Sequence, residues 1–211
     1  MSHHFLYIAD PMCSWCYGFA PVIEALADHF KGRLPVKLMM GGLRAGNTRA
    51  MRAEDKDYIR KAWSTVGPAT GRAFDMAFFD REGFIYDTEP ACRAVVTARH
   101  LAPDTALAFK GRISEAFYGR NRDMTDTEQI TAIAVDAGFD EMAFRSAFLS
   151  PDMRRDTARD FVDAKQMGVE GFPCLLIGGE NRDYAIITNG YRPITGMIEG
   201  IERWLAAQPS G

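Results

Sequence analysis

The amino-acid sequence predicts an α/β protein in which a long helical segment interrupts a small sheet. The chain opens with an apolar run, an amphipathic stretch and a second apolar run, and it closes with two short apolar runs and another amphipathic stretch. Between these ends, helical patterns dominate. We therefore expect a discontinuous domain formed by residues 1–42 and 169–211, with residues 43–168 as an inserted all-helical domain that includes the helix leading back into the sheet.

The opening segment predicts a parallel strand–helix–strand unit. Residues 5–9 are apolar without regular alternation, which is typical of a strand buried on both faces. From about residue 14 to residue 30, apolar side chains recur at three- and four-residue spacing, which predicts a single helix. Residues 36–40 predict the second strand, and Gly41 and Gly42 end it. Such a unit is right-handed by default.

The middle segment predicts a series of helices. Capping residues or early prolines mark the expected starts: Thr88 with Glu89 and Pro90, Asp104, Asp126 or Thr127, Asp140, and Pro151. The last of these helices should end near Gly168. Residues 41–54 and 64–86 mix glycine, arginine and aromatic residues without a clean period, so they predict loops or short helices.

The closing segment predicts a hairpin and a final helix. Residues 171–177 form an apolar strand that begins with a proline, and Gly178 and Gly179 predict a turn. Residues 184–187 then pair back as an antiparallel neighbour. Pro193 and Thr195 predict the start of a helix with one apolar stripe.

Composition excludes several classes of function. The net charge is −3, and Lys and Arg do not cluster among aromatic residues, so nucleic-acid binding is not expected. Because no run reaches the roughly 18 apolar residues of a membrane span, we expect no membrane association. The first apolar run is too short for a signal peptide, and four cysteines do not form a disulfide scaffold. These features favour the cytoplasm, with the periplasm as the alternative if a leader once preceded the sequence.

Cys13 and Cys16 are the most informative pair of residues. They bracket Ser14 and Trp15 between a predicted strand and a predicted helix. At the start of a helix, unpaired backbone N–H groups and the positive end of the helix dipole favour a thiolate, the form that attacks disulfides. The alternatives are half of a zinc site or two idle thiols. Zinc would need two further ligands, and neither remaining cysteine has a histidine at ligand spacing, so the pattern favours redox chemistry.

Two motifs, together with the order of the elements, resemble the DsbA-like branch of the thioredoxin superfamily, and within it the FrnE-like subgroup of protein disulfide isomerases. The motifs are Asp10-Pro11-Met12-Cys13-Ser14-Trp15-Cys16-Tyr17-Gly18 and Gly168-Val169-Glu170-Gly171-Phe172-Pro173. The resemblance covers the whole chain. It implies a thioredoxin fold, with a central mixed sheet flanked by helices and an inserted all-helical domain.

The resemblance also implies the roles of the site residues. Cys13 would be the nucleophile and Cys16 the residue that resolves the mixed disulfide. Pro173 would be cis and face this pair, and Phe172 would offer its backbone N–H and C=O groups to an extended substrate. Ser14 and Trp15 would complete the substrate site. Pro173 could otherwise be only the proline that begins a strand, and Trp15 could simply pack at the helix start.

The predicted activity is that of a thiol:disulfide oxidoreductase or disulfide isomerase acting on protein or peptide thiols. We expect no bound metal or organic cofactor, with glutathione as a candidate redox partner. One alternative is a kappa-type glutathione transferase or a 2-hydroxychromene-2-carboxylate isomerase, which resemble this chain but carry serine where Cys13 stands. Another is a chaperone-like peptide-binding module. For Cys174 a buried structural role is favoured over that of a third redox partner, and for Asp10 a turn is favoured over a proton relay.

Overall fold

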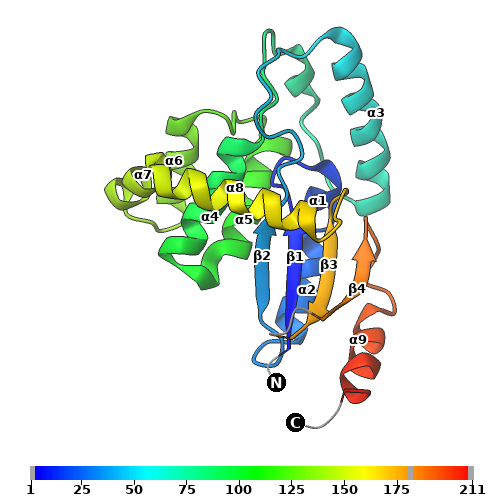
Figure 1. Ribbon diagram of the computed structural model, residues 1–211. Coiled ribbons are helices and arrows are strands. Elements are labelled where there is room, and N and C mark those ends of the chain that lie inside the picture. The colour runs from blue at the N-terminus through cyan, green and yellow to red at the C-terminus, as the bar shows by residue number, and fades with distance from the viewer. Residues whose placement is uncertain (1–2, 180–182, 209–211) are drawn as a thin grey trace.

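The computed structural model describes residues 3–179 and 183–208 of the chain. In these residues one sheet has the strand order β2-β1-β3-β4 (Figure 1). Its strands are β1 (His4–Ala9), β2 (Val36–Met40), β3 (Cys174–Gly178) and β4 (Tyr184–Asn189). Strand β1 pairs in parallel with β2 and antiparallel with β3, and β3 pairs antiparallel with β4. The predicted α/β class with a mixed sheet is confirmed, while part of the predicted hairpin turn lies outside the described residues.

Helices account for most of the remaining described residues. They are α1 (Ser14–Gly18), α2 (Ala20–His29), α3 (Ala53–Thr70), α4 (Glu89–Leu101), α5 (Ala106–Tyr118), α6 (Thr127–Asp136), α7 (Glu141–Leu149), α8 (Pro151–Gln166) and α9 (Met197–Ala206), with the short 3-10 helices η1 (Met76–Asp80) and η2 (Pro103–Thr105). Within residues 43–168 the structure has helices and an isolated bridge between Ala50 and Ile85. The segment between the two parts of the sheet is therefore helical.

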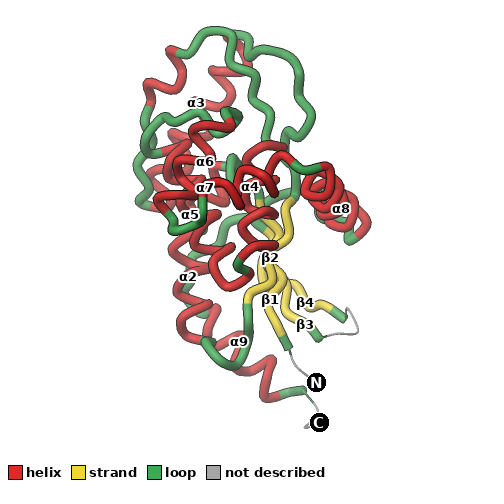
Figure 2. The backbone as a smooth tube through the Cα atoms, turned by 90° about the vertical axis from the view of Figure 1, so that its left-hand side faces the viewer, coloured by secondary structure: helices red, strands yellow, loops and turns green. Residues whose placement is uncertain are grey.

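The two faces of β1 pack against different layers. Phe5 and Tyr7 belong to the main apolar cluster, which also contains residues of α2 and α9. Leu6 and Ile8 point to the opposite face and pack in a smaller cluster with Ala164 of α8. Figure 2 shows α2 and α8 on opposite sides of the sheet. Burial of both faces explains why this strand lacks the alternation of a half-exposed strand.

The predicted helix over residues 14–30 is in fact two helices, α1 and α2. Pro21 lies at the start of α2, and because proline has no N–H it cannot donate to the carbonyl four residues earlier. The N–H of Phe19 still donates to Trp15 at 2.9 Å, whereas the N–H of Val22 donates to Phe19 at 3.0 Å and begins a new helix. The prediction of one helix was wrong because it ignored the missing donor.

Helix α3 is the largest element that the sequence pattern did not predict. It spans 18 residues, in part where loops or short helices were expected. Its buried residues are Ile59, Trp63 and Val66, so most of its surface is polar, and Pro68 lies in its last turn. Trp63 anchors the helix because it packs within about 5 Å, centroid to centroid, of the rings of Phe74 and Phe78. Because this aromatic contact holds α3 in place, the helix lacks the long apolar stripe by which an amphipathic helix is recognised in a sequence.

Two helices begin later than predicted. Asp104 lies in the 3-10 helix η2 and does not cap α5, which begins at Ala106 after the cap residue Thr105. Helix α9 begins at Met197, beyond Pro193 and Thr195. The residue before it is Gly196, whose φ of 73° is a left-handed conformation that favours glycine.

Side chains from two helices cover part of the outer edge of β2. The carboxylate of Asp160 on α8 accepts a hydrogen bond from the N–H of Met40 at 2.9 Å. Arg99 on α4 donates to the carbonyl of Leu38 and pairs with Asp160 at 2.8 Å. These groups occupy positions where a neighbouring strand would otherwise pair. A cavity of about 1210 Å³ lies beside β2, and residues of η2, α5 and α8, among them Pro103, Leu107 and Asp163, line its other side.

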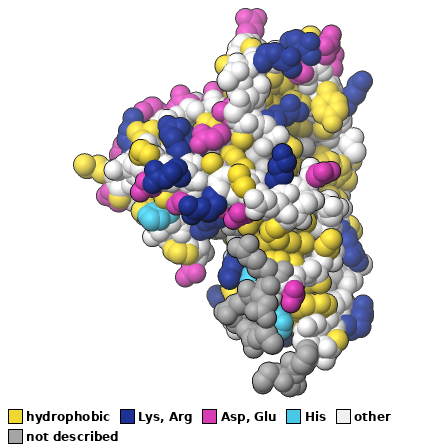
Figure 3. Space-filling view, viewed as in Figure 1, with side chains coloured by type: hydrophobic (Ala, Val, Ile, Leu, Met, Phe, Trp, Pro, Cys, Tyr) yellow, Lys and Arg dark blue, Asp and Glu magenta, His cyan; other side chains and the backbone are white. Residues whose placement is uncertain are grey.

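On the face seen in Figure 3, acidic and basic side chains are interspersed over the helices of the middle segment. Among the helices that the structure describes, none is both long and apolar enough to cross a membrane.

Candidate redox site

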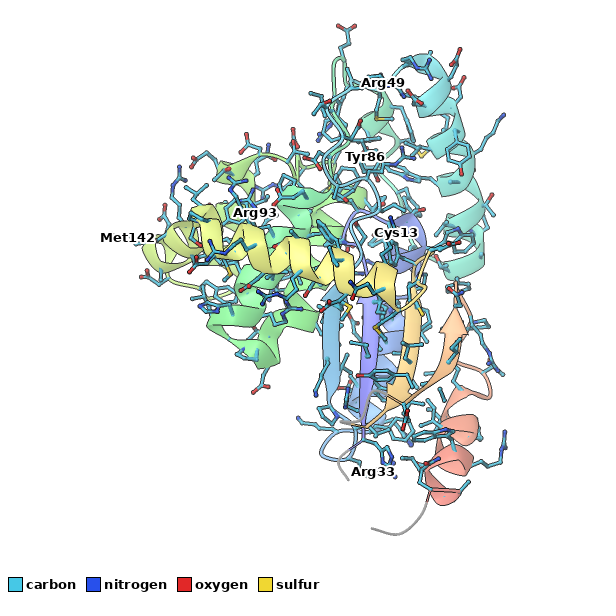
Figure 4. All side chains as sticks on the ribbon, viewed as in Figure 1. Cys13, Arg33, Arg49, Tyr86, Arg93 and Met142 are labelled. Atoms are coloured by element: carbon cyan, nitrogen blue, oxygen red, sulfur yellow. The ribbon has the colours of Figure 1, made fainter. Side chains whose placement is uncertain are left out.

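Cys13 lies at the junction between the loop after β1 and helix α1. It is the N-cap residue of α1, with extended backbone angles. Its N–H donates to the carbonyl of Asp10 at 3.1 Å, and its own carbonyl accepts from the N–H of Tyr17 at 2.9 Å. Figure 4 shows Cys13 at the end of the sheet from which the loop after β1 emerges. Cys16 follows within α1 and is fully buried, whereas Cys13 retains 5% exposure. Cys13 is therefore the less completely buried residue of the pair.

The surroundings of the two thiols make them unequal acids. The hydrogen bond from the Cys16 side chain is the largest influence on Cys13 and lowers the pKa of its thiol, although burial opposes this effect. Burial raises the pKa of Cys16 well above its usual value, and the hydrogen bond with Cys13 raises it further. Cys13 is thus the first of the two to ionise, which is the property of an attacking thiol.

The loop before β3 forms the wall opposite Cys13. The peptide bond between Phe172 and Pro173 is cis. The Cys13 thiol donates to the carbonyl oxygen of Phe172, with the sulfur 3.6 Å away. On the other side of the loop, the carbonyl of Pro173 accepts from the N–H of Gly190 at 2.7 Å. The structure therefore brings together two segments that are 159 residues apart in the chain.

Gly41 determines where the Phe172 ring can lie. This glycine follows β2 directly, and its N–H donates to the carbonyl of Ala9 at 2.8 Å. A Cβ atom added at Gly41 would lie 2.0 Å from the nearest atom of the Phe172 ring. The sequence identified Gly41 only as the end of a strand, because nothing in its surroundings reveals a contact with a residue so far along the chain.

Ser14 and Trp15 are partly exposed beside Cys13. The Trp15 ring lies against that of Tyr191, with the ring centroids 5.5 Å apart and the planes tilted by 31°. Tyr191 in turn donates to the carbonyl of Ala69 on α3 at 3.2 Å. The indole therefore rests on a second aromatic residue that the sequence did not indicate. Together they form an aromatic pair next to Cys13.

Asp10 organises the loop that leads to Cys13. Its carboxylate is fully buried and accepts from the N–H of Met12 at 2.8 Å and from the N–H of Leu43 at 2.7 Å. The thiol of Cys92 on α4 also donates to it, at 3.4 Å. Burial raises the pKa of Asp10. Asp10 therefore forms the turn before Cys13, and its hydrogen bond with Leu43 also connects the segment after Gly42 to the site.

Two tyrosines hold the same loop from the helical segment. The hydroxyl of Tyr86 donates to the carbonyl of Met12 at 2.7 Å and lies 3.2 Å from the hydroxyl of Tyr118. In Figure 4, Tyr86 lies above Cys13, on the side away from the sheet. Burial raises the pKa of both phenols, so they act as neutral hydrogen-bonding groups. Sequence reasoning missed them because aromatic residues in a helical segment are usually core.

Lys110 contributes a buried cation. Its Nζ donates to the carbonyl of Cys16 at 3.0 Å, and the residue is only 1% exposed. No sequence motif marks this lysine, but its position in the helix carries a signal. Lys110 lies on the same stripe of α5 as the buried residues Ala106 and Ile113, where a lysine is unexpected.

Cys174 lies on the other side of the sheet from the redox pair. It belongs to the smaller cluster with Leu6 and Ile8, whereas Cys13 and Cys16 belong to the main cluster. Burial raises the pKa of Cys174. This placement favours a structural role. In the described part of the chain, no group of three or more His, Cys, Asp or Glu side chains is arranged to hold a metal ion.

Known proteins resemble this chain in sequence and in fold. A family model described as a DSBA-like thioredoxin domain matches residues 7–197. The crystal structure of a "putative protein disulfide isomerase" from Nitrosomonas europaea is 37% identical, with a TM-score of 0.92, 99% of this chain covered and 100% of that chain. The cytosolic disulfide reductase DsbM from Pseudomonas aeruginosa shares the fold at 23% identity, with a TM-score of 0.80 over 97% of this chain and 100% of DsbM, and it has also been solved with GSH.

Among curated proteins, the ClpXP adapter protein SpxH from Halalkalibacterium halodurans is 20% identical over 205 residues. The match covers 95% of this chain and 67% of SpxH. The chain thus spans about two thirds of the length of that relative.

Proposed function

Because the chain belongs to the family of DSBA-like thioredoxin domains, we propose that it is a thiol:disulfide oxidoreductase whose working couple is Cys13 and Cys16. One observation carries the proposal. Cys13 is the less buried residue of the pair, the pKa of its thiol is lowered, and its sulfur lies 3.6 Å from the carbonyl oxygen of Phe172 next to the cis-proline. A thiolate at this position can meet a disulfide that approaches along the Phe172 edge.

In the direction of reduction, the Cys13 thiolate attacks one sulfur of a substrate disulfide. A bond forms between Cys13 and that sulfur, and the second substrate sulfur leaves as a thiolate that takes up a proton. Cys16 then loses its proton and attacks the Cys13 sulfur, which releases the first substrate sulfur as a thiolate. Two electrons pass to the substrate, and the protein is left with a Cys13–Cys16 disulfide. The reverse sequence oxidises a dithiol.

The proposed substrates are disulfides and thiols of proteins or peptides. The backbone of Phe172 lies beside the reacting sulfur, where an extended peptide can align, and the rings of Trp15 and Tyr191 provide an apolar neighbour. Glutathione is the proposed partner that restores the reduced pair. We place the protein in the cytoplasm, where thiols are kept reduced and the couple would act in reduction or isomerisation.

The decisive experiment equilibrates the protein with glutathione buffers and measures the fraction of Cys13–Cys16 disulfide by mass spectrometry. Insulin reduction and refolding of scrambled ribonuclease are assayed on the same samples. The parent should form the disulfide and be active, and Cys13→Ser should lose activity, since serine cannot form a mixed disulfide. Cys174→Ser, a change at a buried thiol in the other cluster, is the matched control and should remain active.

Three outcomes would contradict the proposal. No disulfide in any buffer would exclude a redox couple. Glutathione-dependent turnover of a small electrophile that survives Cys13→Ser would indicate a kappa-type transferase or isomerase instead. Prevention of client aggregation that is unaffected by replacing both Cys13 and Cys16 would indicate a peptide-binding module.

A further inference from the structure

Helix α5 of the helical segment holds the redox loop on both sides of Cys13. Lys110 and Ser114 lie one helical turn apart on α5. The Nζ of Lys110 donates to the carbonyl of Cys16 at 3.0 Å, and the hydroxyl of Ser114 donates to the carbonyl of Pro11 at 2.8 Å. Both side chains are buried. Both side chains donate a hydrogen bond to a backbone carbonyl, but only Lys110 brings a positive charge.

A buried ammonium requires compensation. Lysine is almost never fully buried without a partner, because an ion loses its hydration when it leaves water. A carbonyl oxygen such as that of Cys16 is a dipole and offsets only part of this loss. An ammonium at this position is therefore favoured by negative charge nearby.

The titratable groups that face Lys110 come from several segments of the chain: Tyr7 on β1, Asp10 in the following loop, Cys13 and Cys16 around α1, and Glu24 on α2. Tyr7 is neutral because burial raises its pKa, and Nζ lies 5.8 Å from the centre of its ring. Glu24 is exposed, so solvent screens its charge. The buried groups that can act on Lys110 as anions are the Asp10 carboxylate and a thiolate of the pair.

We infer that Lys110 is a positioning residue that stabilises the thiolate of the redox pair and thereby favours the reduced form of the protein. The inference rests on the couple proposed above. Reduction of the Cys13–Cys16 disulfide takes up two electrons and, when Cys13 is left as a thiolate, one proton. The thiolate is a new negative charge in a buried place, and its attraction to the ammonium is stronger there than in water. Burial lowers the pKa of Lys110 and the two thiols oppose this, in agreement with the same attraction.

The test compares the equilibrium of the couple with glutathione in variants that separate charge from contact. Lys110→Met removes both charge and hydrogen bond, and Lys110→Gln removes the charge but keeps a donor. In both, the equilibrium should move at least tenfold towards the disulfide, which is about 30 mV towards a more reducing potential. The pH midpoint for alkylation of Cys13 by iodoacetamide should rise as well. Lys110→Arg keeps the charge, so the potential and the alkylation midpoint should return part of the way to those of the parent.

Ser114→Ala is the matched control, because it removes the neighbouring bond to the loop without removing charge. It should leave the potential and the alkylation midpoint near those of the parent. Circular dichroism verifies that each variant is folded, and the two neutral variants give independent readings if one is unstable. An unchanged potential in a folded neutral variant would overturn the inference, as would an equal shift in Ser114→Ala. A parent that forms no Cys13–Cys16 disulfide would instead reject the proposed function.

Discussion

Cys13 and Cys16 are identical side chains three positions apart, yet their neighbours make them different reagents. Cys16 is enclosed and gives its hydrogen bond to Cys13, so its own pKa is raised while that of Cys13 is lowered. This asymmetry supports the proposed order of events, in which Cys13 attacks first and Cys16 resolves the mixed disulfide. The two remaining cysteines are buried as well, and burial raises the pKa of each thiol.

At the same scale, Gly41→Ala should impair activity more than stability. The new Cβ would lie 2.0 Å from the Phe172 ring, so the ring must move at the edge where we propose that substrates bind. We expect kcat/KM for insulin reduction to fall roughly tenfold, because small displacements of a binding edge are costly to the reaction. Gly171→Ala is the control, since a Cβ there meets nothing within 4 Å. Equal activity of the two variants would show that the ring position does not matter.

At the scale of elements, the sequence best predicted those helices and strands whose position depends on a single local feature, such as a capping residue or a proline. The two strands of the opening unit are confirmed, and the starts of α4, α6, α7 and α8 agree with the capping residues and prolines that predicted them. The break between α1 and α2 was missed although Pro21 signals it. Helix α3 could not be predicted, because it is anchored by Trp63 against rings from another part of the chain. Contacts of that kind are invisible to periodicity.

The element-scale prediction concerns the ion pair at the edge of β2. Arg99→Met would leave the nearly buried carboxylate of Asp160 without its cation and the carbonyl of Leu38 without a donor. We expect a loss of about 2 to 3 kcal/mol in the free energy of unfolding, measured in urea. Arg155→Met on α8 is the control. Its pair with Asp152 is exposed, and its loss should cost less than about 1 kcal/mol. Equal losses of unfolding free energy in the two variants would mean that the ion pair at the edge of β2 adds no more stability than an exposed ion pair.

At the scale of the whole molecule, the redox site is assembled from both parts of the chain. Sequence reasoning identified Cys13, Cys16, Phe172 and Pro173 because short motifs mark them, and their catalytic and binding roles stay predictions. It did not identify Gly41 or Lys110. Their importance depends on which segment packs against the redox loop, and that is a property of the folded chain.

The division into a sheet domain and an inserted helical domain likewise stays a prediction. One apolar cluster contains Tyr7 of the sheet, Trp63 of α3 and Phe144 of α7, so no boundary in the packing separates the two parts. We therefore expect a single cooperative unfolding transition. In the double variant Trp15→Phe and Trp204→Phe, the remaining indole of Trp63 reports only on the helical segment. Its fluorescence should change at the same urea concentration as the far-ultraviolet circular dichroism, and separate midpoints would show independent domains.

The coverage of β2 by Arg99 and Asp160 also affects how an unfolded client would meet this protein. Unfolded chains expose segments that can pair with an unprotected sheet edge. An enzyme with such an edge can therefore aggregate with its own substrates. At the end of β2 nearest the redox loop, Leu38 and Met40 already give backbone groups to side chains of the protein itself. A client strand would find those groups occupied, so in the proposed function the backbone at Phe172 is the place beside Cys13 where a substrate can bind and leave again.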